Sequence, residues 1–282
     1  HPDRVELART GSDVERIVAS GRIAMPLAIE GGHAIENSLE TLREFHAKGV
    51  SSMTLTHNVS HDWADSSADS ARWGGLNDLG REVVREMNHL GMVVDISHVS
   101  DSTFFDVLEV TEDPVIASHS GVKGVNPHRR NLSDDQLRAL AANDGVVAIV
   151  FVLNYLRADY QEAMNELVAV GRPWHRQVPP PEDPDLRSAL DHLSQGRDWP
   201  LENLPTLDAL LAHHAPAVAV AGVDHVGLGA AMYPRPPSPV GIRGVHDYPN
   251  ITAGLKARGY SDEDVRKIMG GNLLRVWKAV TG

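Results

Sequence analysis

The stretch Met92–His98 (MVVDISH) is an apolar run that ends in a histidine, and it decides the fold that the sequence predicts. A short run of this kind, rich in β-branched residues, is typical of a strand buried on both faces. A helical pattern over about Asn77–Leu90 precedes it and stops at Gly91. A second helical pattern, Asp101–Val110, follows it. These residues therefore predict a helix–strand–helix unit.

The same alternation extends in both directions along the chain. Further helices are predicted at about Ser38–Lys48, Ser133–Asn143 and Leu207–Val220, and two more near the C-terminus, one of them beginning at Ser261–Asp264. In all, six strands are predicted, namely Ile23–Glu30, Ser52–His57, Met92–His98, Pro114–His119, Gly145–Leu153 and His225–Ala230. Strands that alternate with helices predict a parallel sheet flanked by helices.

Two architectures fit this alternation, an open doubly wound sheet and a closed (β/α)8 TIM barrel. The Gly-rich phosphate turn that favours the open sheet is absent after the first predicted strand. Six strands are two short of a closed barrel, and a remnant of six strands would expose two sheet edges. We therefore expect one (β/α)8 barrel domain over residues 1–282, with its first two strands upstream of His1. An irregular excursion is expected at about residues 154–205, because Val178–Pro184 (VPPPEDP) cannot form regular structure.

The composition excludes several classes of protein. The 282 residues carry 26 Lys and Arg against 38 Asp and Glu, a net charge of −12, which argues against a nucleic-acid-binding protein. No run of apolar residues approaches the length of a transmembrane helix, which is about 18 residues. The absence of cysteine excludes disulfides, thiolate zinc sites and cysteine nucleophiles. Since the chain starts at His1 without a leader, we expect an upstream segment, and the compartment stays open.

Four consecutive predicted strands end in a residue that can bind a metal, namely Glu30, His57, His98 and His119. In a (β/α)8 barrel the chemistry lies at these carboxyl ends of the strands. One such histidine is most often a buried structural imidazole, but four consecutive strands that end in a possible ligand indicate a site. Two histidines with a carboxylate suit zinc, and three protein ligands leave a position open for catalysis. The adjacent Gly31–Gly32 pair fits either close approach of the backbone to a metal or ligand or simply a turn.

Two further motifs lie outside these strand ends. Arg129-Arg130-Asn131 follows His119 by ten residues; such a motif is usually a solvated basic loop, but near a barrel mouth an arginine can pair with a substrate carboxylate. His1-Pro2-Asp3 has the spacing of a His-x-Asp metal motif. It follows no apolar run and a helical pattern comes after it, so we interpret it as a coincidence.

With these motifs the chain resembles the membrane dipeptidase (renal dipeptidase) family of zinc-dependent hydrolases. The likeness runs nearly end to end, over Ile29–His33 (IEGGH), Leu55–His57 (LTH), Val94–His98 (VDISH), Ala117–Ser120 (ASHS), Arg129–Asn131 (RRN), Asp224–Gly229 (DHVGLG) and Gly271–Arg275 (GNLLR). The resemblance implies a (β/α)8 barrel that binds two zinc ions. It also implies hydrolysis of dipeptides, including those with a C-terminal D-residue, by a metal-bridged hydroxide. Family members often form dimers, so a homodimer is a further expectation.

The resemblance implies a role for each matching residue. Glu30 corresponds to the carboxylate that bridges both metals, and His98 and His119 to the ligands of the second zinc. The His-x-Asp pair that binds the first zinc lies on a strand that we expect upstream of this chain. Only one site's ligands and the bridging glutamate are therefore expected here.

The substrate-facing residues correspond as well, with one departure. His57 matches the residue that contacts the substrate carbonyl and stabilises the oxyanion, Arg130 matches the clamp on the substrate carboxylate, and Tyr155 is its expected neighbour. Ala231 stands where the family has its acid–base aspartate, and Tyr233 where a second aspartate follows. Loss of a general acid–base group typically lowers the rate by about 10²–10⁴-fold.

Three functions therefore stay open. The first is a metallo-dipeptidase that the missing aspartate slows. The second is a catalytically silent homologue that binds a metal or a dipeptide, which the replacement at Ala231 favours. The third is a barrel hydrolase that acts on a non-peptide amide or lactam, with Arg130 still selecting a carboxylate on the substrate.

Overall fold

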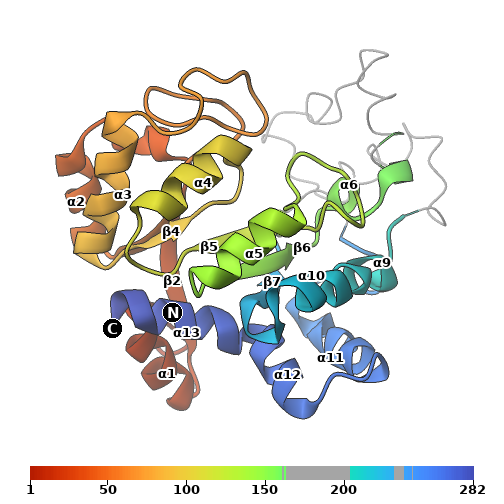
Figure 1. The fold of residues 1–282 in the computed structure, drawn as a ribbon. Helices are drawn as coiled ribbons and strands as arrows, with labels where there is room; N and C mark the ends of the chain where they lie inside the picture. Colours follow the sequence, from red (N-terminus) through yellow and green to blue (C-terminus); the bar gives the residue numbers. More distant parts are fainter. Residues whose placement is uncertain (161, 163–203, 232–237, 243) are drawn as a thin grey trace, which may run out of the picture.

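The computed structural model describes residues 1–160, 162, 204–231, 238–242 and 244–282 of the chain. Tyr233 and most of the excursion expected at residues 154–205, including Val178–Pro184, lie outside these residues, so that expectation stays a prediction. The described residues form one sheet of parallel strands in chain order (Figure 1). The strands are β1 Val5–Ala8, β2 Ile23–Glu30, β3 Val50–Thr54, β4 Val93–Asp95, β5 Ile116–Ser120, β6 Val146–Val150 and β7 Val226–Gly229.

Helices follow the strands as the sequence predicts, except that the helix at Leu153–Leu156 was not predicted. They are α1 Gly11–Ala19, α2 Leu39–Ala47, α3 Asp78–Leu90, α4 Asp101–Val110, α5 Asp134–Ala142, α6 Leu153–Leu156, α9 Leu207–Ala212, α10 His214–Ala221, α11 Tyr248–Ala257, α12 Asp262–Arg266 and α13 Asn272–Thr281. The predicted capping boxes at Ser133 and Ser261 are present, each with its hydroxyl accepting from a backbone N–H three residues later. The helix predicted at Leu207–Val220 is divided into α9 and α10, because Pro216 is tolerated only in the first turn of a helix.

The predicted number of strands is wrong, because β1 forms within a segment that we interpreted as helical. Val5 of β1 pairs in parallel register with Ile23 of β2. With four residues, one of them Glu6, the edge strand is too short to show a strand pattern. The seven strands form a curled parallel sheet of the TIM-barrel type. The expectation that two of the eight barrel strands are absent is therefore not confirmed.

Helix α13 closes the amino-terminal end of the sheet (Figure 1). Val93, Ile116 and Val146 are the first residues of three adjacent strands, and they pack with Val276 and Val280 of α13 in one apolar cluster. A larger apolar core lies between the sheet and the surrounding helices. Since α13 covers the amino-terminal end, the carboxyl-terminal end of the strands is where a site can open.

Two of the four predicted strands that carry candidate site residues end earlier than expected. Strand β3 ends at Thr54 and β4 at Asp95, so His57 and His98 lie in the segments that follow the strands. Glu30 is the last residue of β2, and His119 lies within β5. All four side chains nevertheless come from the carboxyl-terminal end of the sheet.

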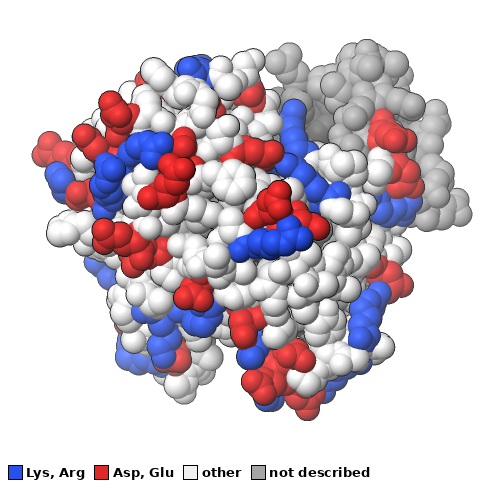
Figure 2. Space-filling model, viewed as in Figure 1, with Lys and Arg blue, Asp and Glu red and all other residues white. Residues whose placement is uncertain are grey.

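The surface combines charges of both signs. Figure 2 shows Lys and Arg side chains interspersed with Asp and Glu on the face that carries α3, α4 and α5. Ion pairs on these helices include Arg81–Asp106 at 3.0 Å and Arg138–Asp135 at 2.9 Å. Among the described helices, none has the combination of length and apolar character that a membrane span needs.

Candidate metal centre

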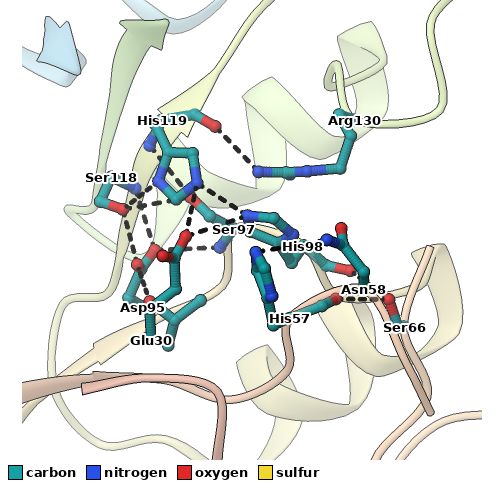
Figure 3. Close-up of polar contacts among 11 residues, drawn as sticks. Glu30, His57, Asn58, Ser66, Asp95, Ser97, His98, Ser118, His119 and Arg130 are labelled. Carbon is teal, nitrogen blue, oxygen red and sulfur yellow. Dashed lines mark hydrogen bonds and ion pairs between the residues drawn. The ribbon is translucent and has the colours of Figure 1, made fainter. Parts of the chain in front are cut away.

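Glu30, His98 and His119 converge at the carboxyl-terminal end of the sheet (Figure 3). Oε1 of Glu30 lies 3.2 Å from Nε2 of His98 and 3.2 Å from Nε2 of His119. The two Nε2 atoms are 2.8 Å apart. Three ligand atoms, from β2, β5 and the segment that follows β4, thus face one point, as the sequence predicts.

The spacing and chemistry of these atoms fit a small divalent cation. Two atoms bound at about 2.0–2.1 Å to a tetrahedral zinc ion lie about 3.3 Å apart, close to the distances seen here. Burial lowers the pKa of His98 to about 4, which outweighs the opposite effect of Glu30. A neutral imidazole can offer a lone pair to a metal. Two imidazoles and one carboxylate are therefore a donor set suited to zinc.

His98 reaches the centre through an unusual backbone conformation. Its φ of 69° is in the left-handed region, which costs a residue other than glycine on the order of 1–3 kcal/mol. The amide of Ser67 donates to the carbonyl of His98 at 2.8 Å. The hydroxyl of Ser66 lies 3.3 Å from the same carbonyl and 2.6 Å from the carbonyl of His57. These bonds hold the turn that redirects the side chain of His98 toward Glu30.

A buried carboxylate, Asp95, lies behind His119. It accepts four hydrogen bonds, from the hydroxyls of Thr54 and Ser118 and from the amides of Ser97 and Ser118. The hydroxyl of Ser118 also lies 2.8 Å from Nδ1 of His119 (Figure 3). The amide of His119 in turn donates to the Ser97 hydroxyl at 3.0 Å. This network connects a buried negative charge to one of the candidate ligands.

His57 lies beside the three candidate ligands. Its ring centre is 4.6 Å from that of His98, and Nδ2 of Asn58 lies 3.4 Å from its Nε2. Burial is the main cause that lowers the pKa of His57, and the positive charge of Arg130 acts in the same direction. A neutral His57 at pH 7 has one N–H with which it can donate to a substrate oxygen.

Arg130 places a buried positive charge next to the centre. Its side chain is 5% exposed, and its Nη2 donates to the carbonyl of His119 at 3.2 Å. The guanidinium lies 5.5 Å from the ring centre of Tyr155, which stacks on His128 at 4.2 Å. Within the described part of the chain, Nε of Arg130 is buried without a hydrogen-bond partner. Burial lowers the pKa of Arg130, but a guanidinium stays charged in a protein, so this site suits an anion.

The glycine pair next to Glu30 lies against side chains of the protein. A Cβ at Gly32 would lie 2.3 Å from the ring of Trp63, and a Cβ at Gly31 would lie 2.5 Å from the ring of His33. Gly31 also has a φ of 110°, which favours glycine. Side chains of the protein therefore approach both glycines closely, and the expected approach of the backbone to a metal or ligand stays a prediction.

A cavity of about 460 Å³ extends from the candidate centre into the sheet interior. Glu30, His119 and Ala231 line the cavity at the carboxyl-terminal end of the strands. Trp277 of α13, the helix that covers the amino-terminal end of the sheet, also lines it. Ala231 has a φ of 44°, in the region that aspartate and asparagine adopt more readily than alanine does. The position that lacks the expected aspartate therefore borders the same space as the candidate ligands.

His1 and Asp3 lie elsewhere. They are exposed and precede β1, at the amino-terminal end of the sheet, whereas Glu30 lies at the carboxyl-terminal end. In the described part of the chain, the group of His, Asp and Glu side chains close enough to hold a metal contains neither of them. Their geometry agrees with the interpretation of His1-Pro2-Asp3 as a coincidence.

Comparison with known proteins assigns the chain to a family. The sequence model of the membrane dipeptidase family (peptidase family M19) matches residues 1–282. The chain belongs to the membrane dipeptidase family. Dipeptidase tcpJ of Claviceps purpurea is 35% identical over 281 residues, which are 99% of this chain and 56% of tcpJ. The chain thus spans about half the length of this relative.

Solved structures of similar proteins have the same fold. The probable dipeptidase PvdM of Pseudomonas aeruginosa is 28% identical with a TM-score of 0.83, over 99% of this chain and 75% of PvdM. A metallopeptidase of Rhodobacter sphaeroides, solved with a phosphinate mimic of the dipeptide L-Ala-D-Ala, is 26% identical with a TM-score of 0.74, over 99% of this chain and 69% of its own. The fold of these structures therefore agrees with the assignment of the chain to the membrane dipeptidase family.

The interpretation of the sequence missed Asp95 and Ser118, although both lie in motifs that carry the family resemblance. Asp95 interrupts an otherwise apolar strand, and Ser118 directly precedes a candidate ligand. A buried charge without a partner is costly, so an aspartate within a core strand indicates a local hydrogen-bond network. That signal was present in the sequence.

Proposed function

We propose that this member of the membrane dipeptidase family hydrolyses dipeptides with the help of zinc, including dipeptides with a C-terminal D-residue. One observation supports this most strongly: three ligand atoms, from Glu30, His98 and His119, lie within 4.8 Å of one another beside a buried arginine. The names of the relatives support the substrate class, since tcpJ is a dipeptidase and the Rhodobacter sphaeroides enzyme was solved with a mimic of L-Ala-D-Ala.

Glu30, His98 and His119 would hold the metal through Oε1, Nε2 and Nε2. A bound zinc ion lowers the pKa of a coordinated water and polarises a carbonyl group. Within the described residues these three form the single group of metal-binding side chains, so we propose one zinc ion per chain of this sequence.

Arg130 and Tyr155 would bind the carboxylate of the dipeptide. A buried guanidinium with a free Nε can form two parallel hydrogen bonds to a carboxylate, which fixes the substrate's orientation. His57, held neutral by burial, would donate its N–H to the carbonyl oxygen as negative charge develops there. Because the chain lacks an aspartate at Ala231, proton transfer to the leaving amine would be slow.

A silent homologue is the second candidate, and the replacement at Ala231 favours it. In that case the chain would bind zinc and a dipeptide but would not turn the dipeptide over. Arg130 fits both candidates, because each binds a dipeptide. Retention of His57 beside the metal ligands favours the enzyme, because a protein that only binds zinc and a dipeptide needs no group to stabilise an oxyanion.

Metal analysis and a turnover assay test both candidates. Purified chain is loaded with zinc, dialysed, and compared with a His98→Ala/His119→Ala variant by elemental analysis, while His89→Ala serves as a control on the exposed surface of α3. We expect about one zinc per chain for wild type and the control, and none for the double variant. L-Ala-D-Ala and L-Ala-L-Ala are then assayed. Equal zinc in all three proteins would contradict the metal site, and zinc binding without turnover of either dipeptide would support the silent homologue.

A further inference from the structure

The carboxylate of Asp95 is buried and saturated with hydrogen bonds. Its side chain is 4% exposed. Oδ1 accepts from the amides of Ser97 and Ser118, both at 2.9 Å. Oδ2 accepts from the hydroxyls of Thr54 at 2.5 Å and Ser118 at 2.6 Å. An ionised carboxylate only accepts hydrogen bonds, so all four groups must donate.

This arrangement determines the direction of the next hydrogen bond. The hydroxyl of Ser118 has a single proton, which it donates to Asp95. Toward Nδ1 of His119, 2.8 Å away, the same oxygen can then only accept. Nδ1 of His119 must therefore carry the ring proton, and Nε2 must carry the lone pair.

The lone pair of Nε2 faces the candidate metal centre. Oε1 of Glu30 lies 3.2 Å from it, and this oxygen is itself an acceptor when the carboxylate is ionised. Two acceptors at that distance repel each other unless a cation or a proton lies between them. His98 differs, because its Nδ1 is buried without a partner among the residues that the structure describes. The chain of hydrogen bonds from Asp95 through Ser118, called the relay below, therefore acts on His119 and not on His98.

We propose that Asp95 and Ser118 are positioning residues that hold His119 in the Nδ1–H tautomer, with Nε2 ready to bind the metal. The inference rests on the proposed function, since it assigns His119 as a zinc ligand. Partners that orient a ligating histidine typically change metal affinity by about 10–100-fold when they are removed.

The variant Asp95→Asn should reverse the relay with little change in shape. The side-chain carbonyl of the asparagine would keep the two amide donors, and its NH2 group would take the place of Oδ2. That group donates, so the Ser118 hydroxyl would accept from it and donate to Nδ1 of His119 instead. We expect the ring proton of His119 to move to Nε2, where it blocks the metal.

The test is long-range ¹H–¹⁵N NMR of the histidine rings in zinc-free protein, above about pH 8 where an imidazole is neutral. Wild type should show Nδ1–H for His119, Asp95→Asn should show Nε2–H, and zinc affinity should fall by about 10–100-fold in the variant. Ser118→Ala, which removes the connecting hydroxyl, should leave a mixture of tautomers, and Ser118→Thr should restore Nδ1–H. Thr54→Val removes a different donor to Asp95 and should keep the wild-type tautomer.

The outcomes separate this inference from the proposed function. Nε2–H in the wild type, or Nδ1–H retained in both Asp95→Asn and Ser118→Ala, would overturn the relay even if the protein binds zinc. A loss of zinc affinity in Thr54→Val equal to that in Asp95→Asn would show that Asp95 acts through packing, and would also overturn it. A wild type with Nδ1–H but no zinc binding would contradict the proposed function and leave the tautomer assignment intact.

Discussion

The main-chain carbonyl of His119 accepts a hydrogen bond from Nη2 of Arg130 at 3.2 Å, so one residue contacts both halves of the site. The ring of His119 faces Glu30, and its backbone anchors the guanidinium. Strand β5 is held between β4 and β6, which leaves this residue little freedom to move. The separation between the candidate metal and the candidate carboxylate clamp is therefore determined by the backbone of a central strand.

Arg130→Lys tests the clamp. Lysine keeps the charge but loses the fork that binds both oxygens of a carboxylate. We expect KM for a dipeptide to rise by at least about tenfold, the loss of a hydrogen bond between charged groups, while kcat changes less. Arg129→Lys, at the exposed neighbouring position, is the matched control. An equal effect on C-terminally amidated dipeptides would contradict the clamp.

Ala231→Asp tests whether the missing acid–base group limits the reaction. The backbone at Ala231 has a φ of 44°, which aspartate tolerates, and the position lines the cavity beside Glu30 and His119. We expect turnover of an L,D-dipeptide to rise by at least about tenfold. Ala231→Asn has nearly the same shape but cannot transfer a proton, so it should show no gain. If Asp and Asn behave alike, the chain is a silent homologue for another reason.

Much of the fold could be predicted from the sequence, because the central strands are buried on both faces. Apart from Asp95 and His119, strands β3 to β6 consist of apolar or small residues, and each helix that the sequence predicts begins at a cap or ends at a glycine. Strand β1 was missed because a four-residue edge strand with a glutamate gives no such run. Its conformation depends on pairing with β2, which local sequence does not encode.

The candidate ligands and their meeting at the carboxyl ends of the strands could be predicted, but the backbone conformation that directs His98 toward Glu30 could not. His98 adopts a φ of 69° because Ser66 and Ser67, about thirty residues earlier in the chain, hold its carbonyl. Contacts between segments so distant in sequence leave no local pattern. The Asp95 network is the opposite case, since a charged residue in an apolar strand was visible and was not interpreted.

His57→Asn tests the oxyanion contact. His57 lies 4.6 Å from His98, ring centre to ring centre, but is not among the three ligand atoms that converge. We therefore expect zinc content to stay unchanged while kcat falls by about 10²–10³-fold, as when one oxyanion donor is removed. The measurement can be made in the Ala231→Asp background if wild-type turnover is low. A loss of zinc in His57→Asn would show that this residue belongs to the metal site instead.

His214 should make the folded state sensitive to acid. It is fully buried in α10, its Nδ1 lies 3.3 Å from the carbonyl of Leu210, and burial lowers its pKa to about 4. An exposed imidazole in the unfolded chain titrates near about 6.5, so between these values the unfolded state binds the additional proton. The contribution of this group to the free energy of unfolding is thus fully present above about pH 6.5 and falls by about 3 kcal/mol as the pH decreases toward 4.

Denaturant unfolding of His214→Leu across this range should give a shallower dependence of the free energy of unfolding on pH than wild type. His89→Gln, on the exposed surface of α3, should match wild type. Parallel curves for His214→Leu and wild type would show that the acid sensitivity comes from other groups.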